Sequence, residues 1–237
     1  MRSDDSGYIT VRQENHDYYG GNQNLFPEKK LKGYGCGLIA ASDVCMYLMD
    51  CPNIFEWDRY YEYVKQIEKY FFYLPFLGMS GISLSIGINL VFSRFKLPYH
   101  ASWKVMPMGD RTRDRIMSML SRGFPVIISI GPNFPNVFGK KKLALYRKND
   151  RGQYKPAGSV NGHYVVVTEF PEEGKMKISS WGQTYYIDWQ EYLAYSHKKS
   201  ISLFTNYLEI RPSSRRKGSA PKDRTEDKGQ GRGEAAG

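Results

Sequence analysis

The sequence is poor in cysteine and contains no recognisable motif for binding a metal or a phosphate. Only three of its 237 residues are cysteines, Cys36, Cys45 and Cys51, and an odd number in one short segment is not a disulfide framework. The motifs CxxC, HExxH and GxxxxGK(S/T) are missing, as are paired histidines at ligand spacing. We therefore expect no cofactor and no metal, and the cysteine pattern favours a reducing compartment, the cytoplasm.

Long uninterrupted apolar runs are missing as well. The N-terminal segment has no basic region followed by an apolar run, so no signal peptide is expected. The uncharged stretch 70–93 has 24 residues, enough to span a bilayer, but Pro75, Gly78 and Gly81 interrupt it. We therefore expect no membrane span, and we expect a turn between two helices at 75–81.

Acidic side chains are outnumbered by basic ones, 24 against 34, which gives a formal net charge of +10. Part of this excess lies in residues 212–237, where seven basic and four acidic side chains accompany no aliphatic or aromatic residue larger than Ala. Such a segment cannot contribute to a core, and we expect it to be a disordered basic tail. The rest of the chain has no run of five basic residues and no nucleic-acid motif, so no specific nucleic-acid partner is expected.

The periodicity of apolar residues changes once along the chain. Residues 1–19 are expected to form a polar arm, and residues 20–211 a single domain. Helical spacing of apolar residues predicts helices over 36–50, 56–73, 82–95 and 111–122. Later segments separated by turn signals predict strands: PVIISIG, LALYRK, HYVVVTEF, KMKISSW, TYYIDW and ISLFTNYLEI. This order indicates an α+β fold with N-terminal helices packed on a C-terminal antiparallel sheet.

Cys36 lies where a helix is expected to begin, within the string GYGCG. The unpaired N–H groups and the positive end of a helix stabilise a thiolate at its first turn. Gly35 and Gly37 carry no side chain that would block a carbonyl group from approaching the sulfur. Cys36 is therefore a candidate nucleophile, with a small inert residue at a helix start as the alternative interpretation. Cys45 lies nine residues later, on another side of the helix, and is expected in the core.

A nucleophilic thiol needs a base, and the chain has four histidines that could serve. His16 lies in the polar arm, His100 in a loop and His197 in the turn SHKKS. His163 differs, because it opens the strand YVVVTEF, where an imidazole can face a cleft. We therefore take His163 as the candidate base, with a structural histidine in a strand as the alternative.

Three segments together resemble the papain-like cysteine peptidase superfamily: YGCGLIAASDV around Cys36, GHYVVV at His163, and the triplet SWG. They are similar to its bacterial branch related to bacteriocin-leader-processing peptidases, whose motifs are a Cys-Gly at a helix start and a later Gly-His strand. The resemblance covers residues 20–190. It implies a papain-like fold, in which a helix with the nucleophile packs against a sheet with the base, and a peptide or protein substrate.

The resemblance also implies a residue that orients the imidazole and an amide that binds the oxyanion. The orienting residue is Asn or Asp in the family, and the matching position here is Ser179. The family's oxyanion Gln lies about six residues before the Cys, where this chain has Lys30. Gln23, thirteen residues before the Cys, is the nearest candidate amide. Its rivals are Asn22 and Asn24.

Two functions are therefore open. In the first, Cys36 and His163 hydrolyse a peptide or amide bond, or transfer the acyl group to an amine, with Ser179 and Gln23 completing the site. In the alternative, a catalytically impaired papain-like fold binds a peptide or a partner protein, which the departures at Ser179 and Lys30 favour. A third and weaker hypothesis is a membrane-associated protein that uses 70–93.

Overall fold

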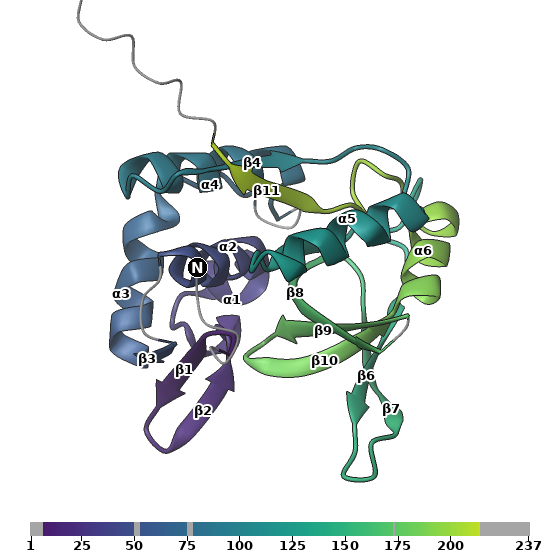
Figure 1. Ribbon diagram of the computed structural model, residues 1–237, viewed down its shortest axis with the longest axis horizontal. Coiled ribbons are helices and arrows are strands. Elements are labelled where there is room, and N and C mark those ends of the chain that lie inside the picture. The colour runs from purple at the N-terminus through teal and green to yellow at the C-terminus, as the bar shows by residue number, and fades with distance from the viewer. Residues whose placement is uncertain (1–6, 50–52, 75–77, 173, 214–237) are drawn as a thin grey trace, which may run out of the picture.

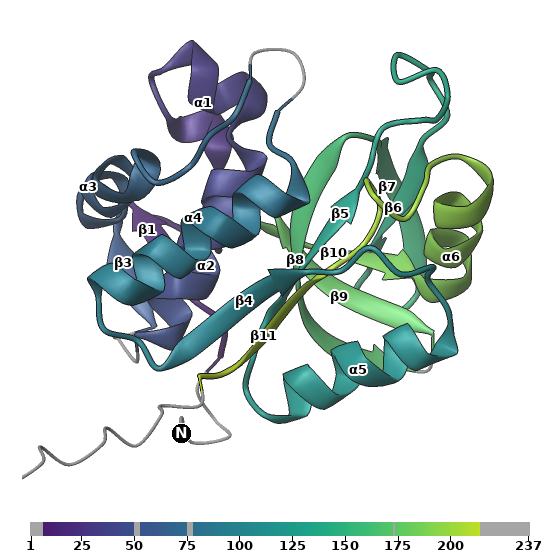
Figure 2. The same cartoon turned by 90° about the horizontal axis from the view of Figure 1, so that it is seen from above.

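The first four α-helices lie in one half of the fold and the six-stranded sheet lies in the other, as Figures 1 and 2 show. The computed structural model describes residues 7–49, 53–74, 78–172 and 174–213. One half holds helices α1 (Lys29–Tyr34), α2 (Cys36–Leu48), α3 (Trp57–Glu68) and α4 (Gly81–Arg94). The other half is built on a six-stranded antiparallel sheet. The expectation of helices beside an antiparallel sheet is confirmed.

The six-stranded sheet places strands in an order that differs from their order in the chain. From one edge to the other it runs β5 (Val126–Ile130), β8 (His163–Glu172), β9 (Lys175–Ser180), β10 (Gln183–Asp188), β6 (Leu143–Lys148) and β7 (Tyr154–Val160). Strand β8 is therefore interior, and His163 begins it, paired with Ile130 of β5. The strand expected to present the imidazole is thus an interior strand of the sheet, and His163 lies at its N-terminal end.

Helix α2 is the central helix of the fold. Eleven of its thirteen residues are buried, because its sequence is apolar on nearly every side. It packs against β8 and β5 of the sheet and against α3 and α4. Cys45 is fully buried in this helix, so its expected place in the core is confirmed. Cys36 opens the helix as its first residue, with Gly35 at the N-cap.

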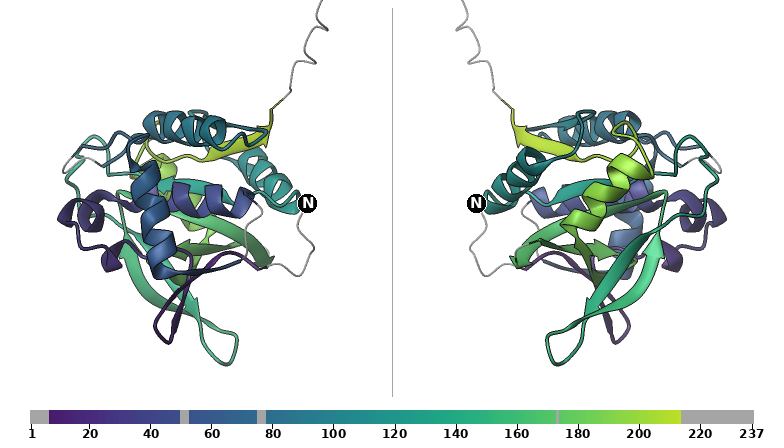
Figure 3. Two further views of the ribbon diagram at one scale, coloured as in Figure 1. Left: turned by 90° about the vertical axis from the view of Figure 1, so that its left-hand side faces the viewer. Right: turned by 90° about the vertical axis from the view of Figure 1, so that its right-hand side faces the viewer.

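The remaining elements cover the sheet and join the two halves. Helix α5 (Asp110–Ser121) packs on β8 and β5, and α6 (Trp189–Lys198) packs on β10 and β6 (Figure 3). Strands β4 (Tyr99–Trp103) and β11 (Leu208–Pro212) form a two-stranded ribbon beside α4. Within the described residues, no helix is both long enough and apolar enough to cross a membrane.

The segment expected to be a polar arm is instead part of the domain. Strands β1 (Thr10–Gln13) and β2 (His16–Tyr19) form a hairpin, and β1 pairs in parallel with β3 (Ile54–Glu56). Ile9 and Val11 are completely buried, and they anchor this hairpin to the core. The expected boundary at residue 20 is therefore wrong for residues 7–19, because a few apolar residues among polar ones are enough to bury one face of a hairpin. The residues before Gly7 and those after Ser213 lie outside the described part.

Several predicted element boundaries also differ from the structure. The helix expected over 56–73 ends at Glu68, although Phe71 and Tyr73 beyond it are still buried. The segment PAGSV, which lies between the predicted strands LALYRK and HYVVVTEF, is part of edge strand β7, and an edge strand accommodates Pro156 because proline has no N–H to donate. The strand expected over 201–210 is formed only from Leu208 onward, where it pairs with β4. Its pairing with the main sheet is limited to an isolated bridge between Tyr207 and Ile128 of β5.

Helix α6 was not expected from the sequence, and a capping signal marks its start. The side chain of Asp188 accepts a hydrogen bond from the backbone N–H of Glu191, at 3.0 Å. An Asp followed three residues later by Glu is a typical N-terminal signal of a helix. His197, expected in a turn, lies in this helix, and one of its ring nitrogens is 2.9 Å from the carbonyl oxygen of Met108.

Candidate active site

One pocket brings together the residues that the sequence singled out from opposite ends of the domain. Its wall on the helical side comes from the segment before α2 and from α2 itself, and its wall on the sheet side comes from β8, β9 and the turn that follows. The lining residues are Gly21, Gln23, Cys36, Ile39, Ala40, Asp43, His163, Tyr164, Val166, Ser179, Ser180 and Trp181. Of the four histidines, only His163 lines it.

The thiol of Cys36 is held in a partly buried position at the first turn of α2. Burial raises its pKa, although backbone N–H groups of Tyr164, Gly37 and Cys36 itself favour the thiolate. These N–H groups are the unpaired donors of a helix start together with one donor from the facing strand. Burial outweighs them, so the thiol is neutral at ordinary pH.

The imidazole of His163 is neutral as well. The side chain is only 7% exposed, and burial lowers its pKa to about 4. Its Nε2 lies 2.8 Å from the hydroxyl oxygen of Ser180. In the tautomer in which Nε2 donates to that hydroxyl, Nδ1 is unprotonated and can accept a proton. The pocket therefore combines a neutral thiol with a neutral base.

Ser180, and not Ser179, is the partner of the imidazole. Ser179 lies opposite Val166 in the β8–β9 pair, and directly opposite residues share one face of a sheet. Because faces alternate along a strand, Ser180 lies on the other face, which is the face of His163. The hydroxyl of Ser179 instead donates to the carbonyl oxygen of Tyr19, at 2.7 Å. The prediction that Ser179 orients the imidazole is therefore wrong by one residue.

Trp181 covers the imidazole, which the sequence analysis did not anticipate. Its ring stacks on that of His163 with centroids 4.4 Å apart and an interplanar angle of 15°. Trp181 and Gly182 form the two-residue turn between β9 and β10, with φ angles of 50° and 70°. Such a turn needs positive φ at both positions, and a bulky residue rarely adopts it. The strained backbone of Trp181 thus holds its indole against the imidazole of His163.

Gln23 is the only one of the three candidate amides that lines the pocket. It lies in the short 3₁₀ helix η1 (Gln23–Leu25), it is 9% exposed, and its Nε2 donates to the carbonyl oxygen of Lys32 at 2.7 Å. Asn22 instead caps η1, because its side-chain oxygen accepts from the backbone N–H of Asn24 at 3.0 Å. Lys30 points elsewhere, with its Nζ 4.0 Å from the ring centroid of Tyr73.

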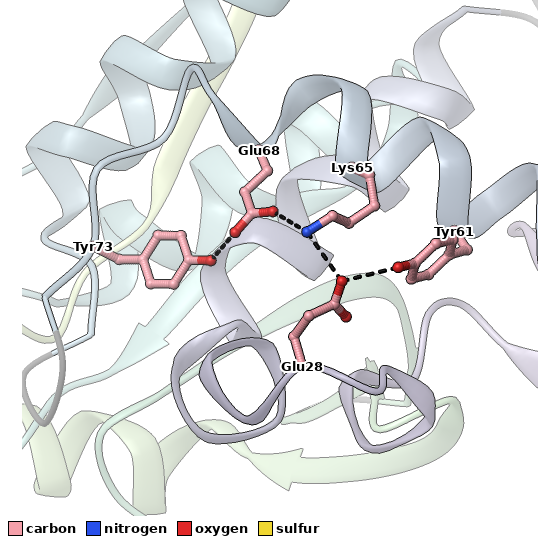
Figure 4. Close-up of polar contacts among 5 residues, drawn as sticks. All are labelled: Glu28, Tyr61, Lys65, Glu68 and Tyr73. Carbon is pink, nitrogen blue, oxygen red and sulfur yellow. Dashed lines mark hydrogen bonds and ion pairs between the residues drawn. The ribbon is translucent and has the colours of Figure 1, made fainter.

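The short helix that supports Gln23 is braced against α3 by the charged network shown in Figure 4. Glu28, the N-cap of α1, accepts from the hydroxyl of Tyr61 at 2.9 Å and pairs with Lys65 at 3.1 Å. Lys65 also pairs with Glu68 at 2.6 Å, and Glu68 accepts from the hydroxyl of Tyr73 at 2.5 Å. These contacts hold α1, which carries the carbonyl of Lys32, in place against α3.

The part of the chain that the structure describes offers no metal site, since no group of three or more potential ligands is suitably placed. A scan against models of known protein families finds no match, and neither does a search of curated protein sequences. The chemistry of the pocket is therefore judged from its own residues.

Proposed function

We propose that the protein is a papain-like thiol hydrolase that cleaves a peptide or amide bond in a peptide or protein substrate. The proposal rests on one observation: a thiol at a helix start, an imidazole hydrogen-bonded through its Nε2 and a buried amide all line one pocket. A nucleophile, a base with an orienting partner and an oxyanion donor are the parts that acyl transfer requires. Because a thiol nucleophile must stay reduced, we place the protein in the cytoplasm.

In the proposed reaction, Sγ of Cys36 attacks the carbonyl carbon while His163 takes the thiol proton. A C–S bond forms, and the carbonyl oxygen becomes an oxyanion that accepts hydrogen bonds from the amide of Gln23 and the backbone N–H of Cys36. His163 then gives the proton to the leaving nitrogen, and the C–N bond breaks. Water attacks the resulting thioester, its proton passes to His163, and the acid leaves as the thiol regains a proton. An amine in place of water would give acyl transfer.

Because the thiol and the imidazole are both neutral, His163 acts as a general base and not as one half of a resting ion pair. Burial disfavours both charged forms, raising the pKa of Cys36 and lowering that of His163. The proton then moves only as the C–S bond forms. Attack of the neutral thiol on an electrophile therefore depends on His163.

Replacing Ser180 with Ala should lower the rate at which Cys36 is acylated by p-nitrophenyl acetate by about tenfold, because one hydrogen bond to the base is lost. Ser179→Ala is the matched control, since its hydroxyl is engaged with Tyr19 and not with the imidazole. Release of p-nitrophenolate in the first turnover measures the rate. An equal loss in both variants would contradict the assignment of Ser180.

The test of the proposed function is the alkylation rate of Cys36 by iodoacetamide between about pH 5 and about pH 9, read by mass spectrometry of its peptide. An ordinary thiol reacts only as it ionises near about pH 8.5. With His163 as a general base, Cys36 should react well below that pH, and His163→Ala should remove at least about tenfold of the rate at about pH 6. His197→Ala, a histidine outside the pocket, should change nothing.

A different result would favour the second candidate function. The orienting hydroxyl of Ser180 carries no charge, and burial raises the pKa of the thiol. If Cys36 reacts like an ordinary thiol with or without His163, the catalytic proposal fails. The fold would then serve as a module that binds a peptide or partner protein.

A further inference from the structure

Asp43 is a buried carboxylate at the floor of the pocket that the proposed reaction does not use. It lies seven residues after Cys36 in α2, about two turns further on and on the same face of the helix. It is 2% exposed. No described lysine, arginine or histidine forms an ion pair with it, so hydrogen bonds alone hold this side chain.

The hydrogen bonds of Asp43 connect three elements. Both carboxylate oxygens accept from the backbone N–H of Gly21, at 3.1 and 3.0 Å, and Oδ1 also accepts from the hydroxyl of Tyr60 at 2.6 Å. Tyr60 comes from α3, and the hydroxyl of Tyr8, before β1, faces the same carboxylate. Gly21 lies two residues before Gln23, so Asp43 holds the chain at the point where it enters the pocket.

The chain passes so close to Asp43 that only glycine fits there. A Cβ on Gly21 would lie 1.9 Å from the hydroxyl oxygen of Tyr60. Gly20 has a φ of +78°, and its Cβ would lie 2.4 Å from the hydroxyl oxygen of Ser179 and 2.6 Å from Oδ2 of Asp43. Contacts with Tyr60, Ser179 and Asp43 therefore leave no room for a side chain and fix the path of the backbone here.

Two neighbouring tyrosines of α3 secure the two ends of the segment that carries Gln23. Tyr60 donates to Asp43, which holds Gly21, and Tyr61 donates to Glu28, which begins α1. Gln23 lies between these two anchors and is itself tied to α1 through the carbonyl of Lys32. The anchor at Glu28 is partly exposed, whereas the anchor at Asp43 is buried within the pocket wall.

We propose that Asp43 is a positioning residue: by holding the N–H of Gly21, it sets the amide of Gln23 at the place where the oxyanion forms over Cys36. This inference rests on the proposed function. The hydrogen bonds of Asp43 go to Gly21 and Tyr60 and not to the thiol, so it acts through the segment it holds. Its effect is therefore confined to steps in which an oxyanion develops.

Two reagents that attack the same sulfur separate this role from a general effect on folding. Acylation by p-nitrophenyl acetate passes through a tetrahedral oxyanion, whereas alkylation by iodoacetamide displaces iodide at a saturated carbon and forms none. A residue that positions the oxyanion donor affects the first reaction and not the second. A residue that only supports the fold, or that disturbs the thiol and its base, affects both.

Asp43→Asn should lower the acylation rate of Cys36 by about tenfold, while the alkylation rate stays within about twofold. Gln23→Ala should show the same split, and the double variant should lose no more than Gln23→Ala alone, because Asp43 acts through Gln23. Tyr60→Phe removes one hydrogen bond to the same carboxylate and should give a smaller loss of the same kind. It also keeps the inference testable if Asp43→Asn does not fold.

Asn89→Ala is the matched control, since Asn89 also joins two elements through hydrogen bonds to backbone, here α4 and β4 at 2.7 and 2.9 Å, away from the pocket lining. It should lower stability and leave both reactions of Cys36 unchanged. Equal losses of acylation and alkylation in Asp43→Asn and Tyr60→Phe, or no loss in either, would overturn the inference. If Cys36→Ala leaves ester cleavage unchanged in the otherwise native protein, the proposed function itself has failed.

Discussion

Alanine at position 23 should lower the rate of Cys36 acylation by about 10²–10³-fold, the usual effect of removing one oxyanion donor. A side-chain amide has two N–H donors, and one of those of Gln23 is used by the carbonyl of Lys32. The second remains for the pocket. The measurement is the first-turnover release of p-nitrophenolate from p-nitrophenyl acetate, compared with the wild-type protein at equal concentration.

The neighbouring amide provides the control for this large effect. Asn24 is exposed, belongs to the same 3₁₀ helix and does not line the pocket, so Asn24→Ala should leave the rate unchanged. A loss of less than about threefold in Gln23→Ala would show that the backbone N–H of Cys36 binds the oxyanion without this side chain. A similar loss in Asn24→Ala would point to collapse of the segment and not to a lost donor.

Substitutions at Asp43 and His163 should change the pH dependence of stability in opposite directions. Burial raises the pKa of Asp43 from 3.8 to about 7, so the folded protein binds this proton more tightly than the unfolded chain does. The resulting stability is present below about pH 4 and is lost as pH rises to about 7. Burial lowers the pKa of His163 from 6.5 to about 4. The stability linked to His163 is present above about pH 6.5 and is lost as pH falls to about 4.

In the wild-type protein, the contribution of Asp43 to the free energy of unfolding falls as pH rises, and the contribution of His163 increases. Between about pH 4 and pH 6.5 the two contributions oppose each other, each changing by about 1.4 kcal/mol per pH unit. Relative to wild type, Asp43→Asn should therefore lose stability as pH falls through this range, and His163→Gln should lose it as pH rises. Urea unfolding of the three proteins at several pH values measures the differences, and all other titrating groups cancel. A difference that does not depend on pH would show that the substituted group does not titrate differently in the folded state.

The helices and strands nearest the site could be predicted because their own sequences specify them. The apolar residues of α2 and α4 recur at helical spacing, β5 and the first half of β8 are short apolar runs, and β9 begins with alternating lysines and apolar residues. The hairpin β1–β2 could not be predicted, because its few buried apolar residues, Tyr8, Ile9 and Val11, stand among polar ones and show no clear periodicity. Strand β7 escaped because Pro156 and Gly158 read as a turn when the pairing partner is unknown.

The nucleophile and base candidates were recognisable from their local settings, whereas their partners depend on how distant segments meet. Ser179 and Ser180 are adjacent, and only the register of β9 against β8 determines which of them faces His163. Asp43 offered a signal that sequence reasoning overlooked, since it is a single carboxylate in a helix that is otherwise nearly all apolar. Its partner Gly21 lies 22 residues away along the chain, and no local pattern connects the two.

The two walls of the pocket are made far apart in time as well as in sequence. His163 follows Cys36 by 127 positions, so at about 5–20 residues per second a ribosome adds it roughly 6–25 s later. Throughout that interval the nascent chain has the thiol of Cys36 but lacks His163, Ser180 and Trp181. The proposed pair of thiol and imidazole is assembled only when β8 and β9 pair and close against α2, so on the proposed function newly made chains pass through synthesis before they can be active.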